Sequence, residues 1–197
     1  MANKQEYRNL TKVEKIKEIN DTLISSAERN AYNLYLTALE NEDIETINYF
    51  ESFGDRPFQF ILNYRVYNQN LLFGFDDKNL NENGRIERVV FLEKEDILIY
   101  AHKNGWKELN KIQIAKGKNG KWTNGLYTNT NTGGYAGGCS VWDDIFENKD
   151  LAIIDACKKM IKYHTEHSWN ASNMVIFEAN ELIQKVLGNR PVQLSFF

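Results

Sequence analysis

Apolar residues recur every three or four positions over the first fifty residues, which is the period of an α-helix. The pattern predicts helical segments over 13–23, 27–39 and 41–53, the first two forming either a helical hairpin or one kinked helix. Residues 11–14, with the sequence Thr-Lys-Val-Glu, have the form of a capping box, which marks a helix start. Gly54 stands where a left-handed residue would end the third helix.

Between residues 58 and 66 the period shortens to two, because apolar and polar side chains alternate apart from Ile61, and this predicts a β-strand. Further strands are expected at 71–75, 85–92, 96–102, 111–115 and 121–127. Asn-Gly pairs begin at Asn83, Asn104 and Asn119, and such pairs favour tight hairpin turns. The pattern therefore predicts an antiparallel β-meander, followed by a polar, glycine-rich loop over 129–138.

The helical period returns after residue 144, and it predicts helices over about 151–164 and 172–187, the last ending at Gly188. Helices, then strands, then helices are typical of an α+β fold. We expect a helical N-terminus, a central antiparallel β-meander and C-terminal helices packed on one face of the sheet. Because the sequence shows no internal repeat and no linker, we expect a single domain over 1–187 and an extended tail over 188–197.

Composition narrows the classes of protein that this sequence can encode. The 197 residues are 42% hydrophobic, and 24 Lys and Arg residues face 27 Asp and Glu residues for a formal net charge of -3. A disordered or fibrous chain is excluded, and binding of nucleic acid over the whole surface is disfavoured. We expect no membrane partner, because no apolar run approaches the roughly 20 residues that span a bilayer. Without a recognisable secretory signal the expected location is the cytoplasm, where Cys139 and Cys157 are free thiols.

The last residues of the sequence carry its most specific pattern. Pro191 bars a continuing helix and favours an extended Arg190, so two aromatic side chains follow on a projecting peptide. That peptide, Gln193-Leu194-Ser195-Phe196-Phe197, resembles the short linear motif by which bacterial proteins dock on the replication sliding clamp. The motif usually reads Gln-Leu-Ser or Gln-Leu-Asp followed by Leu-Phe, and only Phe196 departs from it.

The resemblance implies a role for each side chain of the motif. Leu194 and Phe197 would fill two apolar subsites of the clamp, Gln193 would fix the register by hydrogen bonds, and Phe196 would take the intermediate aliphatic site. It also implies a bacterial, phage or plasmid protein that works at DNA. The alternative is that Leu194, Phe196 and Phe197 fold back to complete an apolar surface of the domain.

A second candidate surface is the basic segment 103–121, in which six lysines accompany a single acid, Glu108. Lysines neutralise phosphates and exposed aromatic rings stack on bases, so a β-ribbon of this composition could hold single-stranded nucleic acid. The candidate contacts are Lys103, Trp106, Lys107, Lys111, Lys116, Lys118, Lys121 and Trp122. The alternative is a solvated hairpin whose lysines resist edge aggregation and whose tryptophans are in the core.

No catalytic or metal-binding signature is complete. The glycines of 133–138 lack the Lys-Ser/Thr of a phosphate-binding loop, Cys139 has no assigned base, and Cys157, His164 and His167 lack zinc-site spacing. We therefore expect a non-enzymatic accessory protein of DNA metabolism without cofactors. The alternatives are an enzyme acting on nucleic acid or a nucleotide under the 133–138 loop, and an inhibitor of a host replication or defence factor.

Overall fold

The chain divides into two compact units, Met1–Val89 and Val90–Phe197, and each has a hydrophobic core of its own. The computed structural model describes residues 6–101, 109–130, 133–167 and 173–188. The sequence pattern suggested one domain over 1–187, whereas the described residues form two units. The difference arises because the N-terminal helices carry enough aromatic side chains to enclose a core without the sheet.

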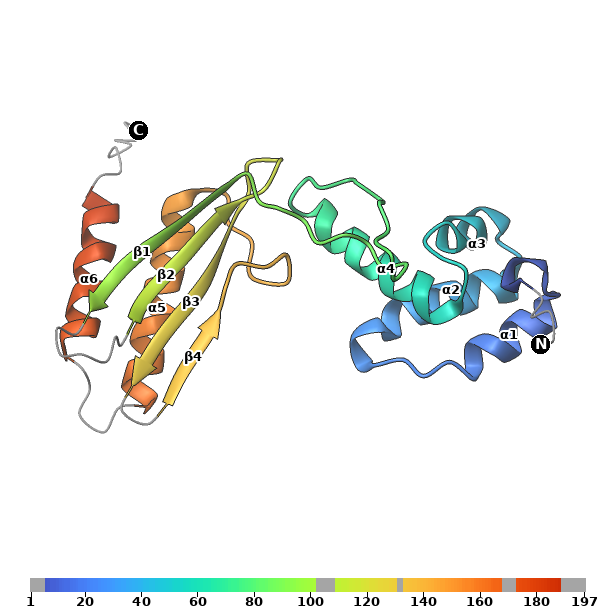
Figure 1. Ribbon diagram of the computed structural model, residues 1–197, viewed down its shortest axis with the longest axis horizontal. Helices are drawn as coiled ribbons and strands as arrows, with labels where there is room; N and C mark the ends of the chain where they lie inside the picture. The colour runs from blue at the N-terminus through green and yellow to red at the C-terminus, as the bar shows by residue number, and fades with distance from the viewer. Residues whose placement is uncertain (1–5, 102–108, 131–132, 168–172, 189–197) are drawn as a thin grey trace, which may run out of the picture. The chain divides into compact units, whose positions relative to one another are not determined.

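The first unit is helical (Figure 1). Its elements are the 3-10 turns η1 (Tyr7–Asn9) and η2 (Ser26–Glu28) and the helices α1 (Lys12–Asn20), α2 (Arg29–Asn41), α3 (Ile44–Glu51) and α4 (Pro57–Leu71). The predicted capping box is confirmed, since the Thr11 hydroxyl accepts the Glu14 N–H and the Glu14 carboxylate accepts the Thr11 N–H. Of the two alternatives for the first segments, the hairpin-like pair is correct, because α1 and α2 are separate helices.

Gly54 does not take the left-handed conformation expected of it. α3 ends at Glu51, and Ser52 caps it with right-handed backbone angles. The glycine provides space instead, because a Cβ atom at this position would lie 2.7 Å from the Cγ of Gln59. Its role is therefore close packing against α4 rather than the ending of α3.

The strand predicted over 58–66 is wrong, because these residues belong to α4. Pro57 occupies the first turn of the helix, where its missing N–H costs nothing, and Arg56 before it is extended. Phe60, Ile61 and Asn63 are buried at helical spacing. Ile61, the residue that interrupts the alternation, therefore belongs to the buried face of this helix.

The strands predicted at 71–75 and 85–92 are also wrong. Instead of a sheet, this part of the chain has an isolated antiparallel bridge between Leu80 and Ile86. The buried Asn63 of α4 accepts the Ile86 N–H at its side-chain oxygen, with an N to O distance of 3.1 Å. Backbone bonds from the Asn81 N–H to the Arg85 carbonyl and from the Glu87 N–H to the Asn79 carbonyl add to this contact, so a local turn held on α4 takes the place of the predicted strand.

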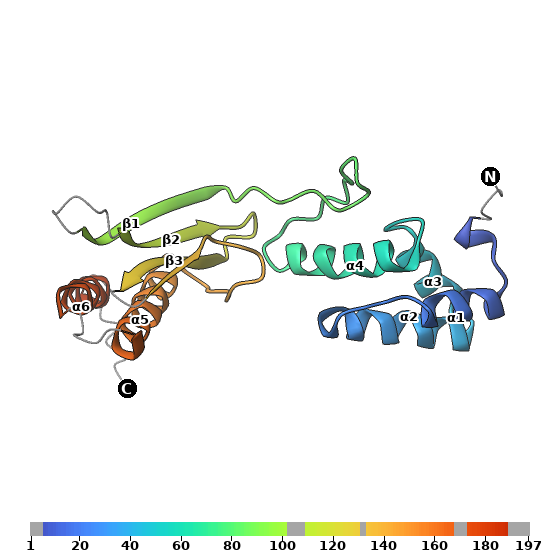
Figure 2. The ribbon, with the colours of Figure 1, turned by 60° about the horizontal axis from the view of Figure 1, so that its bottom comes forward.

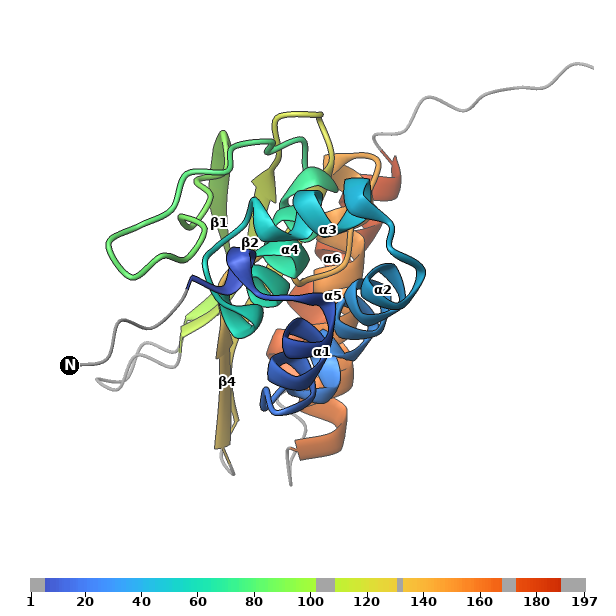
Figure 3. The same cartoon turned by 90° about the vertical axis from the view of Figure 1, so that its right-hand side faces the viewer.

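The second unit is an antiparallel meander covered by two helices. It consists of β1 (Glu93–Ala101), β2 (Leu109–Lys116), β3 (Trp122–Thr130), β4 (Gly133–Gly137), α5 (Lys149–His167) and α6 (Asn173–Gly188). The strand order is β1-β2-β3-β4, and each neighbouring pair is antiparallel. α5 and α6 lie side by side on one face of the sheet, as Figures 1 and 2 show, and Figure 3 views the sheet nearly edge-on. The predicted α+β fold is confirmed.

Three strands of the meander lie where the sequence predicted them, with bounds shifted by a few residues. The loop predicted over 129–138 is wrong in part, because residues 133–137 form the edge strand β4. The pairing runs from Leu126 opposite Gly137 to Thr130 opposite Gly133. Glycine-rich sequence lacks the β-branched residues that indicate a strand, so the pattern could not show this one.

The core of the second unit lies between the sheet and its two helices. Ile112 and Ile114 of β2 pack in one cluster with Cys157 and Met160 of α5. Because side chains alternate along a strand, Gln113 projects from the other side, which we call the open face of the sheet. No helix among the described residues combines the length and the apolar character needed to cross a membrane.

Candidate functional site

The second unit has a groove between β4 and α5. α5 packs on β2 and β3, and α6 packs on β1, so the helix-facing side of the edge strand β4 borders only one flank of α5. The resulting β4–α5 groove has a volume of about 250 Å³. It is lined by Asn124, Gly125, Leu126, Tyr135, Gly137, Asp143, Lys159, Lys162, Tyr163 and Glu166.

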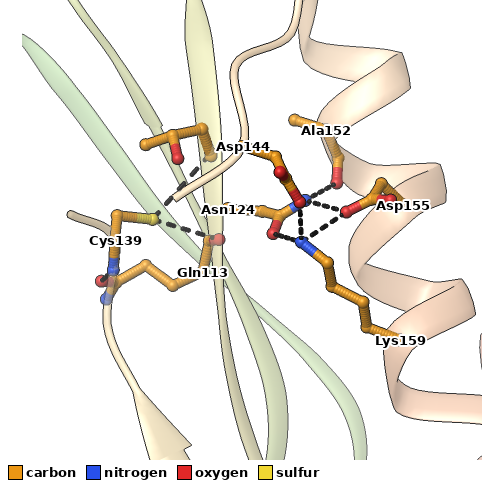
Figure 4. A network of polar contacts seen from close by, with 8 residues as sticks. Gln113, Asn124, Cys139, Asp144, Ala152, Asp155 and Lys159 are labelled. Carbon is orange, nitrogen blue, oxygen red and sulfur yellow. Dashed lines mark hydrogen bonds and ion pairs between the residues drawn. The ribbon is translucent and has the colours of Figure 1, made fainter. Parts of the chain in front are cut away.

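Lys159 is the centre of a polar network at one end of this groove (Figure 4). Its Nζ lies 2.7 Å from a carboxylate oxygen of Asp144, 2.8 Å from one of Asp155 and 3.2 Å from the Asn124 side-chain oxygen. Burial disfavours the charged form, but the hydrogen bonds that the ammonium group donates to Asp144 and Asp155 outweigh it, so the pKa of Lys159 is raised above its ordinary value. The two carboxylates neutralise the ammonium group, which therefore offers no unbalanced charge to an anion.

Asn124 fixes this network to the sheet. Its side-chain NH2 donates to the Ala152 carbonyl at 2.9 Å and to the Asp155 carboxylate at 3.0 Å. Asn124 is buried on β3, and Asp155 is four residues before Lys159 on α5. The i, i+4 spacing of the acid and the lysine was visible in the sequence, whereas the asparagine became recognisable only through the fold.

Asp143 gives the groove a carboxyl group that holds its proton more tightly than usual. It is partly buried, and burial is the largest cause of its raised pKa, to which the nearby Asp144 charge adds. The Ser140 N–H donates to its carboxylate at 2.8 Å, and this bond works in the opposite direction. The groove therefore combines a carboxyl group of raised pKa with a lysine whose charge is balanced by two carboxylates.

Two tyrosines form the aromatic side of the groove. The ring centroids of Tyr135 on β4 and Tyr163 on α5 are 6.4 Å apart, with an interplanar angle of 51°. Tyr163 also stacks on His167 at 4.4 Å and 18°, which holds its ring against the helix. Tyr135 is 50% exposed, so one wall of the groove offers a ring surface to a planar or apolar group.

On the open face, Cys139 lies over the middle of the sheet. Its N–H donates to the Gln113 side-chain oxygen at 3.0 Å, and its Sγ donates to the Gln113 carbonyl at 3.3 Å (Figure 4). Burial raises the pKa of the Cys139 thiol from 9.0 to about 12, and the Asp143 charge adds to the rise. The thiol is therefore protonated at neutral pH, which does not suit a nucleophile.

The close approach of this segment to the sheet depends on Gly125 of β3. A Cβ atom there would lie 2.5 Å from the Gly137 carbonyl oxygen and 2.7 Å from the Cys139 nitrogen. The glycine thus allows residues 137–139 to cross the open face. Sequence reasoning missed it, because a single glycine in a strand pattern has many explanations.

The predicted nucleic-acid contacts are distributed over different surfaces. Lys111 is on the open face, 2.5 Å from a carboxylate oxygen of Asp96 and 4.7 Å from the Tyr127 ring centroid. Lys116 is five residues further along β2 and so projects from the other face, where it pairs with Glu93 at 2.8 Å. The structure therefore does not bring these two lysines together.

The remaining predicted contacts of the basic segment lie at the β2–β3 turn or outside the described residues. Lys121 pairs with Glu147, Lys118 is exposed on the turn, and Trp122 is buried with the Lys116 Nζ 5.5 Å from its ring. Lys103, Trp106 and Lys107 lie outside the described residues, as do Gln193, Leu194, Ser195, Phe196 and Phe197 of the clamp-like motif.

His164 and Cys157, which were weighed as metal ligands, are core residues. The His164 Nε2 lies 2.7 Å from the Thr128 hydroxyl and 3.2 Å from the Asn110 side-chain oxygen, and Cys157 is fully buried. Within the described ranges, no three His, Cys, Asp or Glu side chains are placed to hold a metal ion together.

We compared the chain with models of protein families, with curated proteins and with solved structures. None of them matches.

Proposed function

We propose that the chain is a non-enzymatic accessory protein of bacterial, phage or plasmid DNA metabolism, which docks on the replication sliding clamp through residues 193–197. The observation that carries the proposal is the sequence Gln193-Leu194-Ser195-Phe196-Phe197. It supplies the amide, the aliphatic anchor and the terminal aromatic ring that a peptide needs to fill two apolar subsites in a fixed register. Phe196 in place of leucine would lower the affinity without removing either anchor.

The fold supports docking through the short connection between this peptide and the second unit. α6 ends at Gly188, and only residues 189–192 separate it from Gln193. Even a fully extended connection therefore keeps Gln193 within about 17 Å of the helix end. A docked peptide would hold the second unit close to the clamp and to the DNA inside it, so that weak contacts with DNA act at high effective concentration.

The open face of the sheet is the surface we assign to nucleic acid. The strand alternation puts Lys94 and Lys111 on this face together with Tyr127, whose ring lies under the Lys111 ammonium. Lysines beside an aromatic ring are the groups that hold a phosphate backbone and stack on a base. Asp96 pairs with Lys111 and reduces the net charge, which fits a weak contact that depends on the clamp.

Calorimetric titration of a bacterial sliding clamp with the full chain tests the docking. We expect micromolar binding that weakens at least tenfold in Gln193→Ala, which removes the register-fixing amide, and in Phe197→Ala, which removes the terminal aromatic anchor. Val192→Ala is the matched control, because it shortens the neighbouring side chain outside the motif and is expected to bind as the wild type does. Absence of binding by the wild-type chain would contradict the proposal.

A second candidate function is binding of a nucleotide or similar planar ligand in the β4–α5 groove, as an enzyme of nucleic-acid chemistry would require. The exposed Tyr135 ring and the raised pKa of Asp143 favour it. Saturable binding of mononucleotides that is lost in Tyr135→Ala, and kept in the exposed control Lys158→Ala, would favour this function. Tight clamp binding without any DNA affinity would favour an inhibitor of a host factor.

A further inference from the structure

Lys78, which follows α4 in the first unit, places its ammonium group against three aromatic rings. Its Nζ lies 4.4 Å from the ring centroid of Phe53, 4.6 Å from that of Tyr49 and 5.0 Å from that of Tyr67. A cation within about 6 Å of a ring face is attracted by the quadrupole of the ring. All three rings therefore act on the same charge, and we call Tyr49, Phe53 and Tyr67 the aromatic cage.

The walls of the cage belong to packed helices. Tyr49 is on α3, Phe53 follows α3 closely and Tyr67 is on α4, and the two helices pack against each other. The Tyr49 and Phe53 centroids are 5.2 Å apart with nearly perpendicular rings (87°), and Phe53 and Tyr67 are 5.2 Å apart at 50°. Because the rings differ in orientation, they surround one point from several sides.

The core of the first unit holds these walls in place without help from Lys78. Phe53 is 1% exposed, and Tyr64 packs edge-on against both Tyr49 and Phe53 with centroid distances of 6.0 Å. Tyr64 itself stacks on the fully buried Phe50 at 4.1 Å and 23°. The cage is therefore preformed, which lowers the conformational cost of binding a ligand.

Lys78 is much less constrained than the walls that surround it. It stands on a segment without helix or strand, between the buried Phe75 and the bridged Leu80. Its ammonium group is carried on a flexible four-carbon stem. Rotation of the side chain alone can therefore empty the cage, while Phe75 and Leu80 keep the backbone in place.

We propose that the aromatic cage is a binding site for an organic ammonium ion, with Lys78 as a built-in competitor. A methylated or quaternary ammonium suits three ring faces best, because its methyl groups contact the rings and the ion is the kind that aromatic cages recognise. Lys78 sets a threshold, since a ligand occupies the cage only by displacing the lysine. The site is independent of clamp docking, and each can fail without the other.

Titration with tetramethylammonium chloride, followed by NMR of the tyrosine ring signals, tests the site in the full chain. We expect Lys78→Ala to bind at least tenfold more tightly than the wild type, because the competitor is gone. Lys17→Ala, which removes an exposed lysine of α1, is the matched control and is expected to bind as the wild type does. Tyr49→Leu in the Lys78→Ala background is expected to remove the binding, since Tyr49 is the most exposed wall.

The proposal is overturned if Lys78→Ala and the wild type bind tetramethylammonium equally, or if the neutral analogue tert-butanol binds Lys78→Ala as tightly as the cation does. The unaltered chain gives a second test that needs no variant. Ring currents are expected to shift the Lys78 side-chain protons upfield, and excess tetramethylammonium is expected to return them to the values of an exposed lysine. The proposal would also be overturned if the Lys78 side-chain protons stayed shifted upfield after the tyrosine ring signals had stopped changing with added tetramethylammonium.

The same titration identifies the source of the ammonium group. Choline represents a free small molecule, and a peptide with one trimethyllysine represents a modified partner protein. Tighter binding of one of them to Lys78→Ala supports the site and identifies its source, and failure of both to bind contradicts the proposal.

Discussion

At the scale of single residues, Lys15 and Glu51 form a buried ion pair in the first unit. The Lys15 Nζ lies 2.7 Å from a Glu51 carboxylate oxygen, and the two side chains are 11% and 7% exposed. The same oxygen accepts the Tyr35 hydroxyl at 2.7 Å, and the Tyr7 hydroxyl lies 3.2 Å from that of Tyr35. Removing one partner leaves a charge in a place that water scarcely reaches.

We therefore predict that Glu51→Ala lowers the free energy of unfolding of the first unit by about 3–5 kcal/mol. Chemical denaturation followed by circular dichroism measures this. Glu42→Ala is the control, because its pair with Lys12 is largely exposed, and its unfolding midpoint is expected to stay at the wild-type value. Equal effects of the two substitutions would contradict the assigned burial of the Lys15–Glu51 pair.

Cys139 gives a second prediction for a single residue. Its pKa is raised to about 12, so at pH 8 the folded thiol is expected to react with iodoacetamide at least a hundredfold more slowly than a free thiol. Unfolding in urea restores the ordinary pKa of 9.0 and the ordinary rate. Because the folded state holds the proton more tightly, stability falls as pH rises from about 9 to about 12. If Cys139 in the folded chain were alkylated as fast as a free thiol, the prediction would be contradicted.

For whole elements, the sequence predicted helices with recognisable starts and strands with apolar alternation. The local sequence pattern was enough to predict the Thr11 capping box and the meander of β1, β2 and β3. α4 was missed because its aromatic side chains project from several sides of the helix and imitate a two-residue period. β4 was missed because its glycines carry no pattern, and pairing with β3 is a contact across the fold.

The candidate site was less predictable than the fold for the same reason. Of the groove residues, the sequence favoured only the stretch around Gly137, and it favoured a loop there. Asn124, Lys159 and Asp155 come from β3 and α5, so only the packing of α5 on the sheet brings them together. Neither residue type nor spacing separates a groove asparagine from any other polar residue in a strand.

Gly125 gives a prediction for the sheet. A Cβ atom at Gly125 would meet the Gly137 carbonyl oxygen at 2.5 Å, so Gly125→Ala is expected to destabilise the second unit by about 1–3 kcal/mol and to displace the segment that carries Cys139. Faster alkylation of Cys139 and a lower urea midpoint measure the two effects. Gly133→Ala on β4 is the matched control, because a Cβ atom there has nothing within 4 Å. If Gly125→Ala had the stability and the alkylation rate of the wild type, residues 137–139 would not pack closely against Gly125.

For the whole molecule, two cores that share no residue suggest two cooperative units. We predict that calorimetry of the intact chain resolves two unfolding transitions, or one broad transition that is fitted by the sum of two two-state transitions and not by one. Glu51→Ala is expected to move only the transition of the first unit, and Gly125→Ala only that of the second. A single transition that both substitutions shift together would mean that the units unfold as one.

The two proposals fall on different units of the chain. The aromatic cage belongs to the first unit, and the open face belongs to the second, which also precedes the clamp-like peptide. Together the two proposals predict that the clamp and DNA bind through the second unit and a cationic ligand through the first.

Competition for the clamp tests the central claim most directly. A labelled clamp-binding peptide from another protein is bound to a bacterial sliding clamp, and the full chain is added while fluorescence anisotropy is recorded. The account predicts complete displacement of the peptide at micromolar concentrations of the wild-type chain, and at least a tenfold higher concentration of Phe197→Ala for the same displacement. If the labelled peptide stays bound at the highest concentrations of the wild-type chain, residues 193–197 do not dock on the clamp, and the proposed function is wrong.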